Sequence, residues 1–162
     1  MPFIGVISDE KNENTIRREI VDSLKLRESN VLFIKEKSIE NIKNIKFETI
    51  VLTRKFKNME ILKKMLANAK YLIVNTDRIK NIDMYKELNL QIITFGFNLK
   101  ATVTASSVEE DSSLICVGRD IKTVKNRIIE PQEIKIDSSE DMESIMAVVT
   151  TLLVYDINNK EI

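Results

Sequence analysis

Histidine and tryptophan are both absent from this sequence of 162 residues. Histidine is the side chain most often used for proton transfer near neutral pH, and it is a principal zinc ligand. Its absence argues against a zinc site and excludes Ser-His-Asp and Cys-His nucleophilic catalysis. Carboxylate or lysine chemistry stays open, but no motif indicates it. We therefore predict no catalytic residue, no metal site and no cofactor, and we favour a protein that is not an enzyme.

Cysteine occurs once, and there are only three glycines and two prolines. Cys116 lies in the apolar run of residues 114–117, so we expect it to be a small buried hydrophobic residue. No apolar run approaches the roughly 20 residues of a membrane span. Residues 1–7 are too short, and lack the basic flank, for a signal peptide. These features predict a cytoplasmic protein with no membrane association.

Charge is balanced over the whole chain, with 25 basic and 25 acidic residues, but it is unevenly distributed. Residues 1–100 contain 19 Lys and Arg against 13 Asp and Glu, whereas residues 101–162 contain 6 against 12. Opposite charges of this kind attract within a domain or between two copies. Only residues 54–57 combine basic and aromatic side chains, which is too little for a nucleic-acid surface. We expect a protein partner or a homo-oligomer, and no nucleic acid.

The first hundred residues alternate between short apolar runs and stretches with helical periodicity. This alternation predicts a parallel sheet with right-handed crossovers and with helices on both faces. The expected strands are residues 3–8, 30–35, 47–53, 71–74 and 90–95, and the expected helices are residues 15–26, 39–42, 59–69 and 79–88.

The pattern changes near residue 98, where apolar runs follow one another with only turn-length gaps. Ser138 with Asp141 is typical of a helix start, and an apolar stripe over residues 142–153 follows. We expect residues 158–162 to be a frayed tail. The chain is thus predicted to be a single α/β domain over residues 1–162, with a Rossmann-like, mainly parallel sheet, an antiparallel C-terminal meander and a final helix. The expected meander strands are residues 102–108, 113–119, 127–129 and 133–136.

In an open parallel sheet, ligands bind beyond the carboxyl ends of the strands. The segment after the first strand, residues 8–15, has no glycine and contains Asp9, Glu10 and Glu13. A phosphate-binding loop needs glycines, a lysine at the helix start and a Ser or Thr hydroxyl for magnesium. We therefore interpret this segment as a solvated turn that precedes a helix, not as a nucleotide site.

Several short motifs follow one another in a specific order: a strand that ends in threonine at residues 51–53, Asn-x-Asp at residues 75–77, Thr-Phe-Gly at residues 94–96 and a strand at residues 101–108. In order and spacing they resemble the central, ATP-binding domain of the Mur ligases, the family of the peptidoglycan precursor ligases and folylpolyglutamate synthase. Ile-Gly-Val at residues 4–6 and the last helix extend the resemblance over nearly the full chain.

The resemblance implies a site, because the family's Asn-x-Asp-Asp asparagine lies near the nucleotide base. Transferred to this sequence, the resemblance implies that Asn75, with Asp77 and Thr94 close by, binds a nucleotide or metabolite. A strand-end asparagine also commonly bonds its own turn, which is the simpler interpretation of Asn75. The chain departs from the family in its phosphate loop, replaced by residues 9–14, and in the second Asp of the motif, replaced by Arg78. We also expect no counterpart of the family's flanking domains.

Phosphoryl transfer depends on positioning by the phosphate loop, its lysine and metal ligands, and these are the parts that are missing. We therefore predict a degenerate Mur ligase-like domain, a pseudoenzyme that acts through protein binding or self-association and is linked to cell-wall metabolism. The alternative is a small nucleotide- or metabolite-binding protein that keeps a base pocket near Asn75. An enzyme of unrelated chemistry that uses Asp, Glu or Lys is a third hypothesis.

Two segments of opposite charge are expected at the same edge of the sheet, because the first and third strands both end there. Ion pairs between them would occupy the place of the family's phosphate site and make this edge a partner surface. The residues expected to meet are basic Arg54, Lys55 and Lys57 and acidic Asp9, Glu10 and Glu13.

Overall fold

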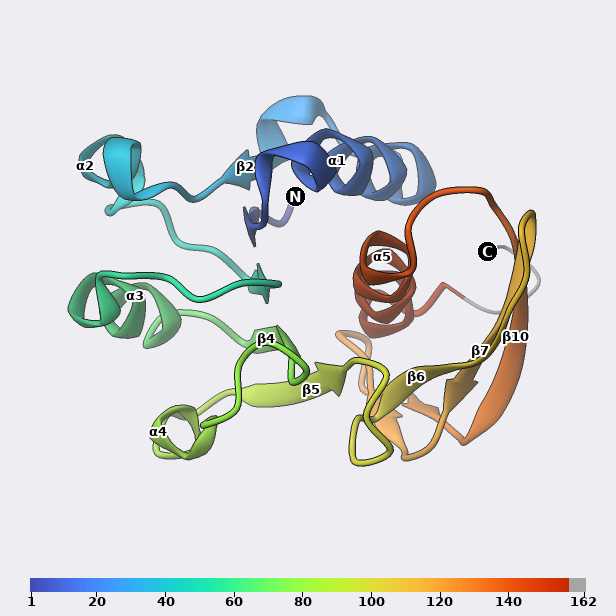
Figure 1. Cartoon of the computed structure of the whole chain (residues 1–162). Coiled ribbons are helices and arrows are strands. Elements are labelled where there is room, and N and C mark those ends of the chain that lie inside the picture. Colours follow the sequence, from blue (N-terminus) through green and yellow to red (C-terminus); the bar gives the residue numbers. More distant parts are fainter. Residues whose placement is uncertain (158–162) are drawn as a thin grey trace.

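A computed structural model describes residues 1–157, and its centre is an eight-stranded sheet with helices on both faces (Figure 1). The strand order is β10-β7-β6-β5-β4-β3-β1-β2. Strands β1 to β6 are mutually parallel, whereas β7 is antiparallel to β6 and to β10. This confirms the predicted fold class. The strands of the sheet are β1 (Ile4–Ile7), β2 (Val31–Phe33), β3 (Thr49–Leu52), β4 (Tyr71–Asn75), β5 (Gln91–Phe95), β6 (Val103–Val108), β7 (Ser112–Val117) and β10 (Gln132–Asp137).

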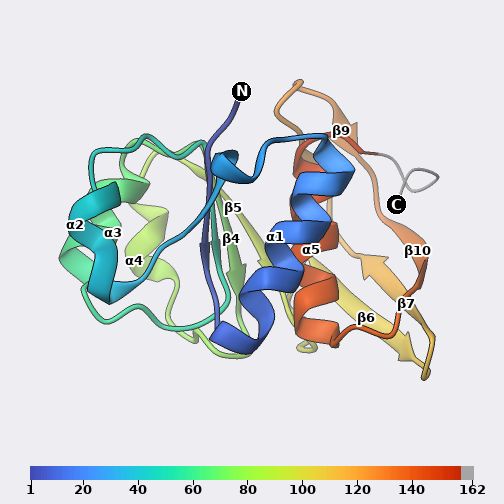
Figure 2. The ribbon, with the colours of Figure 1, turned by 90° about the horizontal axis from the view of Figure 1, so that it is seen from above.

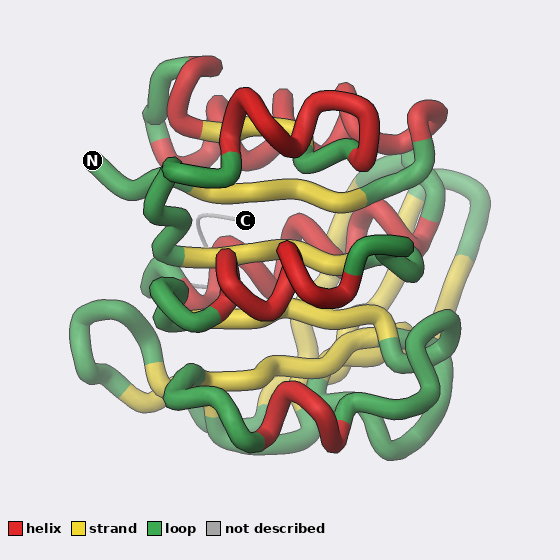
Figure 3. Tube along the Cα trace, turned by 90° about the vertical axis from the view of Figure 1, so that its left-hand side faces the viewer, coloured by secondary structure: helices red, strands yellow, loops and turns green. Residues whose placement is uncertain are grey.

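The helices form two layers, each with its own hydrophobic core. Helices α2, α3 and α4 cover one face of the sheet (Figure 3), and α1 and α5 lie side by side on the other (Figure 2). Within residues 1–157, none of the helices combines the length and the apolar character that a bilayer span requires. The bounds are α1 (Glu10–Leu24), α2 (Ile39–Ile42), α3 (Met59–Leu66), α4 (Asp83–Lys86) and α5 (Met142–Val154), with 3-10 turns η1 (Glu28–Asn30) and η2 (Glu36–Ser38).

Helix α5 lies in the concavity of the sheet, where β6, β7 and β10 curl around it (Figure 1). All its residues from Ser144 to Val154 are buried, although only one apolar stripe was expected to be. The antiparallel strands cover the helix surface that would otherwise face solvent. The hydroxyls of Thr150 and Thr151 donate to the carbonyls four residues earlier, so the all-round burial leaves neither hydroxyl unpaired.

Helix α1 begins at Glu10, whereas the sequence predicted a start at residue 15. Most of the expected turn over residues 9–14 is therefore the first turn of this helix, with Asp9 at the N-cap position. Glu10 and Glu13 lie in that turn, where the positive end of the helix dipole favours negative side chains. Periodicity alone missed this turn because it contains no apolar residue.

Other boundaries also differ from the prediction. Helix α4 has four residues, Asp83–Lys86, instead of the expected 79–88. The expected strand at residues 127–129 does not join the meander; as β9 (Ile128–Ile129) it pairs with an unpredicted strand, β8 (Ile121–Lys122), in a separate two-stranded ribbon. Cys116 is half-buried rather than buried, because it alternates with the inward-facing side chains of β7.

Asp141 is the N-cap of the buried helix α5, so the helix begins three residues later than a cap at Ser138 would place it. Its Oδ1 accepts from the Ser144 N–H at 3.0 Å, and its Oδ2 accepts from the Ser144 hydroxyl at 2.7 Å. We expect Asp141→Ala to lower the free energy of unfolding by about 1 kcal/mol, the usual cost of removing a helix cap. Urea denaturation measures it, with exposed Asp120→Ala as control; equal stability of the two variants would show that the cap is dispensable.

Candidate functional site

Asn75 ends strand β4 at the carboxyl edge of the sheet and is only 2% exposed. Its Oδ1 accepts from the Asp77 N–H at 3.0 Å, and its carbonyl accepts from the Ile79 N–H at 2.9 Å. The side chain therefore bonds its own turn, which is the simpler of the two interpretations that the sequence allowed.

Asp77 holds the connection between β5 and β6. Its carboxylate accepts from the Phe97 N–H at 2.6 Å, the Asn98 N–H at 3.1 Å and the Asn98 side-chain amide at 2.8 Å. Burial alone would raise the pKa of Asp77, but these hydrogen bonds outweigh it and keep that pKa below its ordinary value. Gly96, with φ of +152°, permits the close approach, since a Cβ there would lie 2.8 Å from the carboxylate.

Thr94 joins β5 to the start of β6. Its Oγ1 accepts from the Thr102 N–H at 2.9 Å, and it lies opposite Val74 in the sheet register. The structure thus brings the three predicted binding residues to one edge of the sheet, at the ends of β4 and β5. There each of them makes hydrogen bonds within the protein that join adjacent strands and loops.

Arg78 is the centre of the charged groups at this edge. Its guanidinium donates to Asp9 at 2.8 and 3.3 Å and to Glu143 at 3.0 Å. These contacts join the start of α1, the segment after β4 and the first turn of α5. A cation from this chain therefore lies at the position where the resembling family has the second aspartate of its motif.

Arg78 lowers the pKa of both carboxylates, but the net shifts of the two have opposite signs. The hydrogen bond from Arg78 is the main reason that the pKa of Asp9 is below its ordinary value. Burial raises the pKa of Glu143 above its ordinary value, although Arg78 acts in the opposite direction. Arg78 therefore offsets part of the cost of burying a negative charge on Glu143 in this half-buried place.

Arg54 forms the second ion pair of the edge, and its partner differs from the prediction. The guanidinium bonds both oxygens of Glu36, at 3.2 and 3.3 Å, and its Nε donates to the Ser8 carbonyl at 3.2 Å. Glu13 pairs with Lys35 at 2.9 Å. Ion pairs therefore do form here, but the expected pairing of residues 54–57 with residues 9–13 was wrong. The segment after β2 supplies the partners, Lys35 and Glu36.

The carboxyl edge is poorly suited to a polyphosphate. Asp9 at the N-cap and Glu10 and Glu13 in the first turn put negative charge at the start of α1, where a bound phosphate would otherwise meet backbone N–H groups. The two arginines of the edge already bond carboxylates of this chain. Among residues 1–157, no three His, Cys, Asp or Glu side chains are grouped so that they could hold a metal ion.

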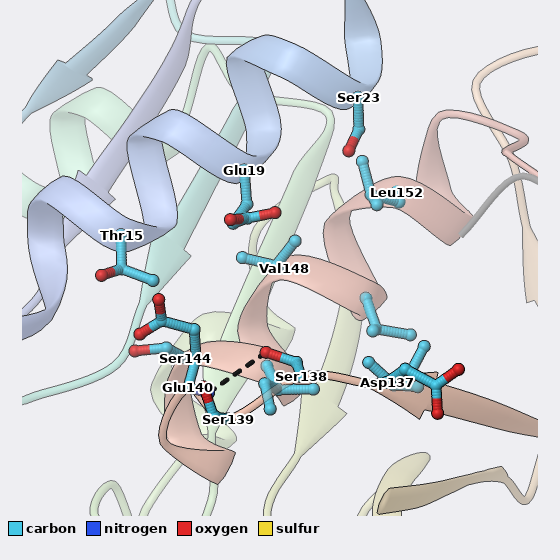
Figure 4. Close-up of a pocket in the computed structure, with 13 residues that line it drawn as sticks. Thr15, Glu19, Ser23, Asp137, Ser138, Ser139, Glu140, Ser144, Val148 and Leu152 are labelled. Atoms are coloured by element: carbon cyan, nitrogen blue, oxygen red, sulfur yellow. Dashed lines mark hydrogen bonds between the residues drawn. The ribbon is translucent and has the colours of Figure 1, made fainter. Parts of the chain in front are cut away.

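A groove of about 320 Å³ lies elsewhere, between α1, α5 and the connection from β10 to α5 (Figure 4). We call it the α1–α5 groove. Its floor is apolar and includes Ile145, Val148 and Leu152 of α5. Figure 4 shows α1 side chains facing those of α5, with residues 137–140 along one side. Hydroxyl groups line the rest, from Thr15, Ser23, Ser138, Ser139 and Ser144.

The α1–α5 groove is acidic. Glu19, Asp137 and Glu140 line it, and no Lys or Arg of residues 1–157 does. At the rim, Arg18 bridges Glu19 and Glu140 at 3.3 and 3.2 Å, so the groove already has one guanidinium bound at its edge. Sequence reasoning missed this site, because its residues come from three segments whose proximity depends on how the sheet curls around α5.

No protein-family model matches the chain, and the search of curated proteins gives no significant match. The resemblance to the Mur ligase central domain therefore rests on the motifs of the sequence. The functional argument rests on the geometry of the carboxyl edge and of the α1–α5 groove.

Millimolar MgATP should not raise the melting temperature of this protein. A ligand stabilises a protein only through binding to the folded state, and the N-terminus of α1 presents three carboxylates instead of a glycine-rich loop. Thermal unfolding with MgATP, against MgCl₂ alone, measures the effect. A clear rise in melting temperature, or triphosphate density against the start of α1, would contradict this expectation.

Replacement of Arg78 should destabilise the protein most at neutral pH. Arg78→Gln leaves Asp9 and Glu143 unpaired, and because these groups are partly exposed we expect a loss of about 1–2 kcal/mol at pH 7. The lowered pKa of Asp9 gives a stabilisation that is present above its unfolded-state pKa and lost as the pH falls through its folded-state pKa. The raised pKa of Glu143 gives a penalty that grows as the pH rises above its unfolded-state pKa, and loss of Arg78 increases it.

The deficit of Arg78→Gln should therefore shrink as the pH falls and both carboxylates become protonated. Urea denaturation between pH 7 and acid pH measures this trend. Arg18→Gln is the matched control, because Arg18 also bridges two carboxylates but at an exposed rim, and its effect should be much smaller. A deficit for Arg78→Gln that does not change with pH would contradict the assignment.

Proposed function

We propose that this chain is a non-catalytic Mur ligase-like domain that acts by binding another protein, in a process linked to cell-wall metabolism. The observation that carries the proposal is that the polar and charged side chains of the carboxyl edge already have partners within this chain. Its arginines pair with carboxylates of the same chain, and its strand-end polar residues bond neighbouring loops. The groups that would bind and activate a nucleotide in the family are thus replaced by groups that stabilise the fold.

The α1–α5 groove is the surface that we assign to the partner. Hydrophobic floors with a polar rim are typical of the centres of protein interfaces, where arginine is a frequent anchor residue. The three carboxylates of the lining favour a basic segment. An incoming arginine or lysine would place its aliphatic part on Val148 and Leu152 and its charged group beside Glu19 and Glu140, in competition with Arg18.

Neutralisation of the groove should weaken capture of the partner. In Glu19→Gln with Glu140→Gln, the fold should persist because both side chains are more than two-fifths exposed. We expect affinity for a purified, reconstituted partner to fall by about tenfold, which corresponds to roughly 1.4 kcal/mol. Arg18→Gln should strengthen binding, because it removes the internal competitor. Glu109→Gln with Glu110→Gln, an equal charge change in the exposed β6–β7 turn, is the matched control.

Sedimentation of the unmodified chain over a range of concentrations distinguishes a second copy from a different protein. If the chain stays monomeric and no captured protein can be reconstituted with it, the proposed function is wrong. If the groove variant binds the same partner as strongly as the control variant does, the assignment of the groove is wrong and another surface binds the partner.

A further inference from the structure

A second cavity, of about 350 Å³, lies on the opposite face of the sheet, between the end of β3, α3 and α4. We call it the α3–α4 cavity; both helices are on the left in Figure 1. Its walls are largely apolar, with buried Phe56 and Ile79 and the partly buried thioethers of Met59 and Met84. Methionine side chains adapt to the shape of a bound apolar group. The cavity is within the size range of small-molecule sites.

Tyr85 gives this cavity a buried hydrogen-bond donor with a weak partner. The residue is 2% exposed, and within residues 1–157 its hydroxyl bonds only the sulfur of Met59, at 3.9 Å. A thioether is a poor acceptor, so the phenol still has the capacity to donate to an oxygen atom. Burial also raises the pKa of Tyr85, which keeps the proton on the phenol at neutral pH. Tyr85 and Met59 both line the cavity.

The charged residues that line the cavity are all basic. Lys55 and Lys80 line it and both are exposed, and within the described part of the chain no Asp or Glu lines it. Neither lysine forms an ion pair with any residue of the part of the chain that the structure describes, 1–157. An apolar cavity, a buried phenol without a good acceptor and two unpaired ammonium groups together select an anion with an apolar body.

We propose that the α3–α4 cavity binds a small organic carboxylate whose aromatic or branched apolar part lies between Phe56, Met59 and Met84. The carboxylate lies toward Lys55 and Lys80 and accepts from Tyr85. Two exposed lysines without a set of converging backbone N–H groups suit a single negative charge better than a polyphosphate. This site is independent of the proposed function, because it lies on the face of the sheet opposite the α1–α5 groove.

The test uses three probes of one shape: 4-phenylbutyrate, 4-phenylbutanol and 4-phenylbutylamine, which are anionic, neutral and cationic. Methionine methyl groups labelled with ¹³C report the location by NMR. Met59 and Met84 line the cavity, whereas Met142 and Met146 lie on the other face of the sheet and serve as internal references. We expect 4-phenylbutyrate to shift the Met59 and Met84 signals in a saturable way, the alcohol to bind about fivefold more weakly and the amine not to bind.

Variants then identify the groups that bind the probe. Lys55→Gln with Lys80→Gln should weaken 4-phenylbutyrate to the level of the alcohol, whereas Lys63→Gln with Lys64→Gln, on the exposed side of α3, should leave its affinity unchanged. Tyr85→Phe should weaken the acid about threefold while the melting temperature changes little, because the hydroxyl gives up only a weak sulfur contact.

Several results would overturn the proposal. One is equal binding of the acid and the alcohol, or binding of the acid that survives the loss of Lys55 and Lys80. Another is that the shifts appear at Met142 and Met146 instead. A fourth probe, AMP, tests the chemical class: if it shifts the Met59 and Met84 signals and 4-phenylbutyrate does not, the site is not a carboxylate site. None of these measurements depends on whether the α1–α5 groove binds a protein.

Discussion

The burial of α5 inside the curled sheet is the constraint on which most of this structure depends. The helix can be apolar all round only because β6, β7 and β10 cover the surface that α1 and the parallel strands leave open. Its start is fixed at the carboxyl edge by the pair between Glu143 and Arg78, and its end at the opposite edge by a 2.8 Å hydrogen bond between Tyr155 and Thr49. The same helix supplies the floor of the α1–α5 groove. The position of α5 therefore determines both the shape of this groove and the ion pair of Glu143 at the carboxyl edge.

The central parallel strands were predictable because β1, β3 and β4 are short runs, rich in β-branched and apolar residues, that are buried throughout. The first turn of α1 was not, because Glu10 to Asn14 has no apolar period and is favoured instead by the helix dipole. The partners of Arg54 and Arg78 depend on strand order: β2 is next to β1, and only β3 separates β4 from β1, so the segments after β2 and β4 both reach the end of β1. Local sequence patterns carry no information on that order.

The three residues predicted to bind a nucleotide or metabolite illustrate the same limit. Residue type and strand-end position correctly place Asn75, Asp77 and Thr94 together, but they do not reveal what each side chain bonds. The Asp77 carboxylate accepts three hydrogen bonds from Phe97 and Asn98, a strong set of donors for one half-buried anion. If that carboxylate turned toward a ligand, the loop that connects β5 and β6 would lose these three hydrogen bonds. This energetic cost supports a structural role for these three residues at the carboxyl edge.

The uneven distribution of charge along the sequence places basic and acidic surfaces on opposite faces of the sheet. The α3–α4 cavity is built wholly from the basic first hundred residues, whereas two of the three carboxylates of the α1–α5 groove come from the acidic remainder. The two surfaces lie on opposite faces of the sheet, with the closed carboxyl edge between them. The segment after β3 contributes to the carboxyl edge and to the α3–α4 cavity. Arg54 pairs with Glu36 at the edge and donates to the carbonyl of Lys55, whose side chain lines the cavity. One loop thus closes the edge that resembles a nucleotide site and places a cation at the neighbouring apolar cavity.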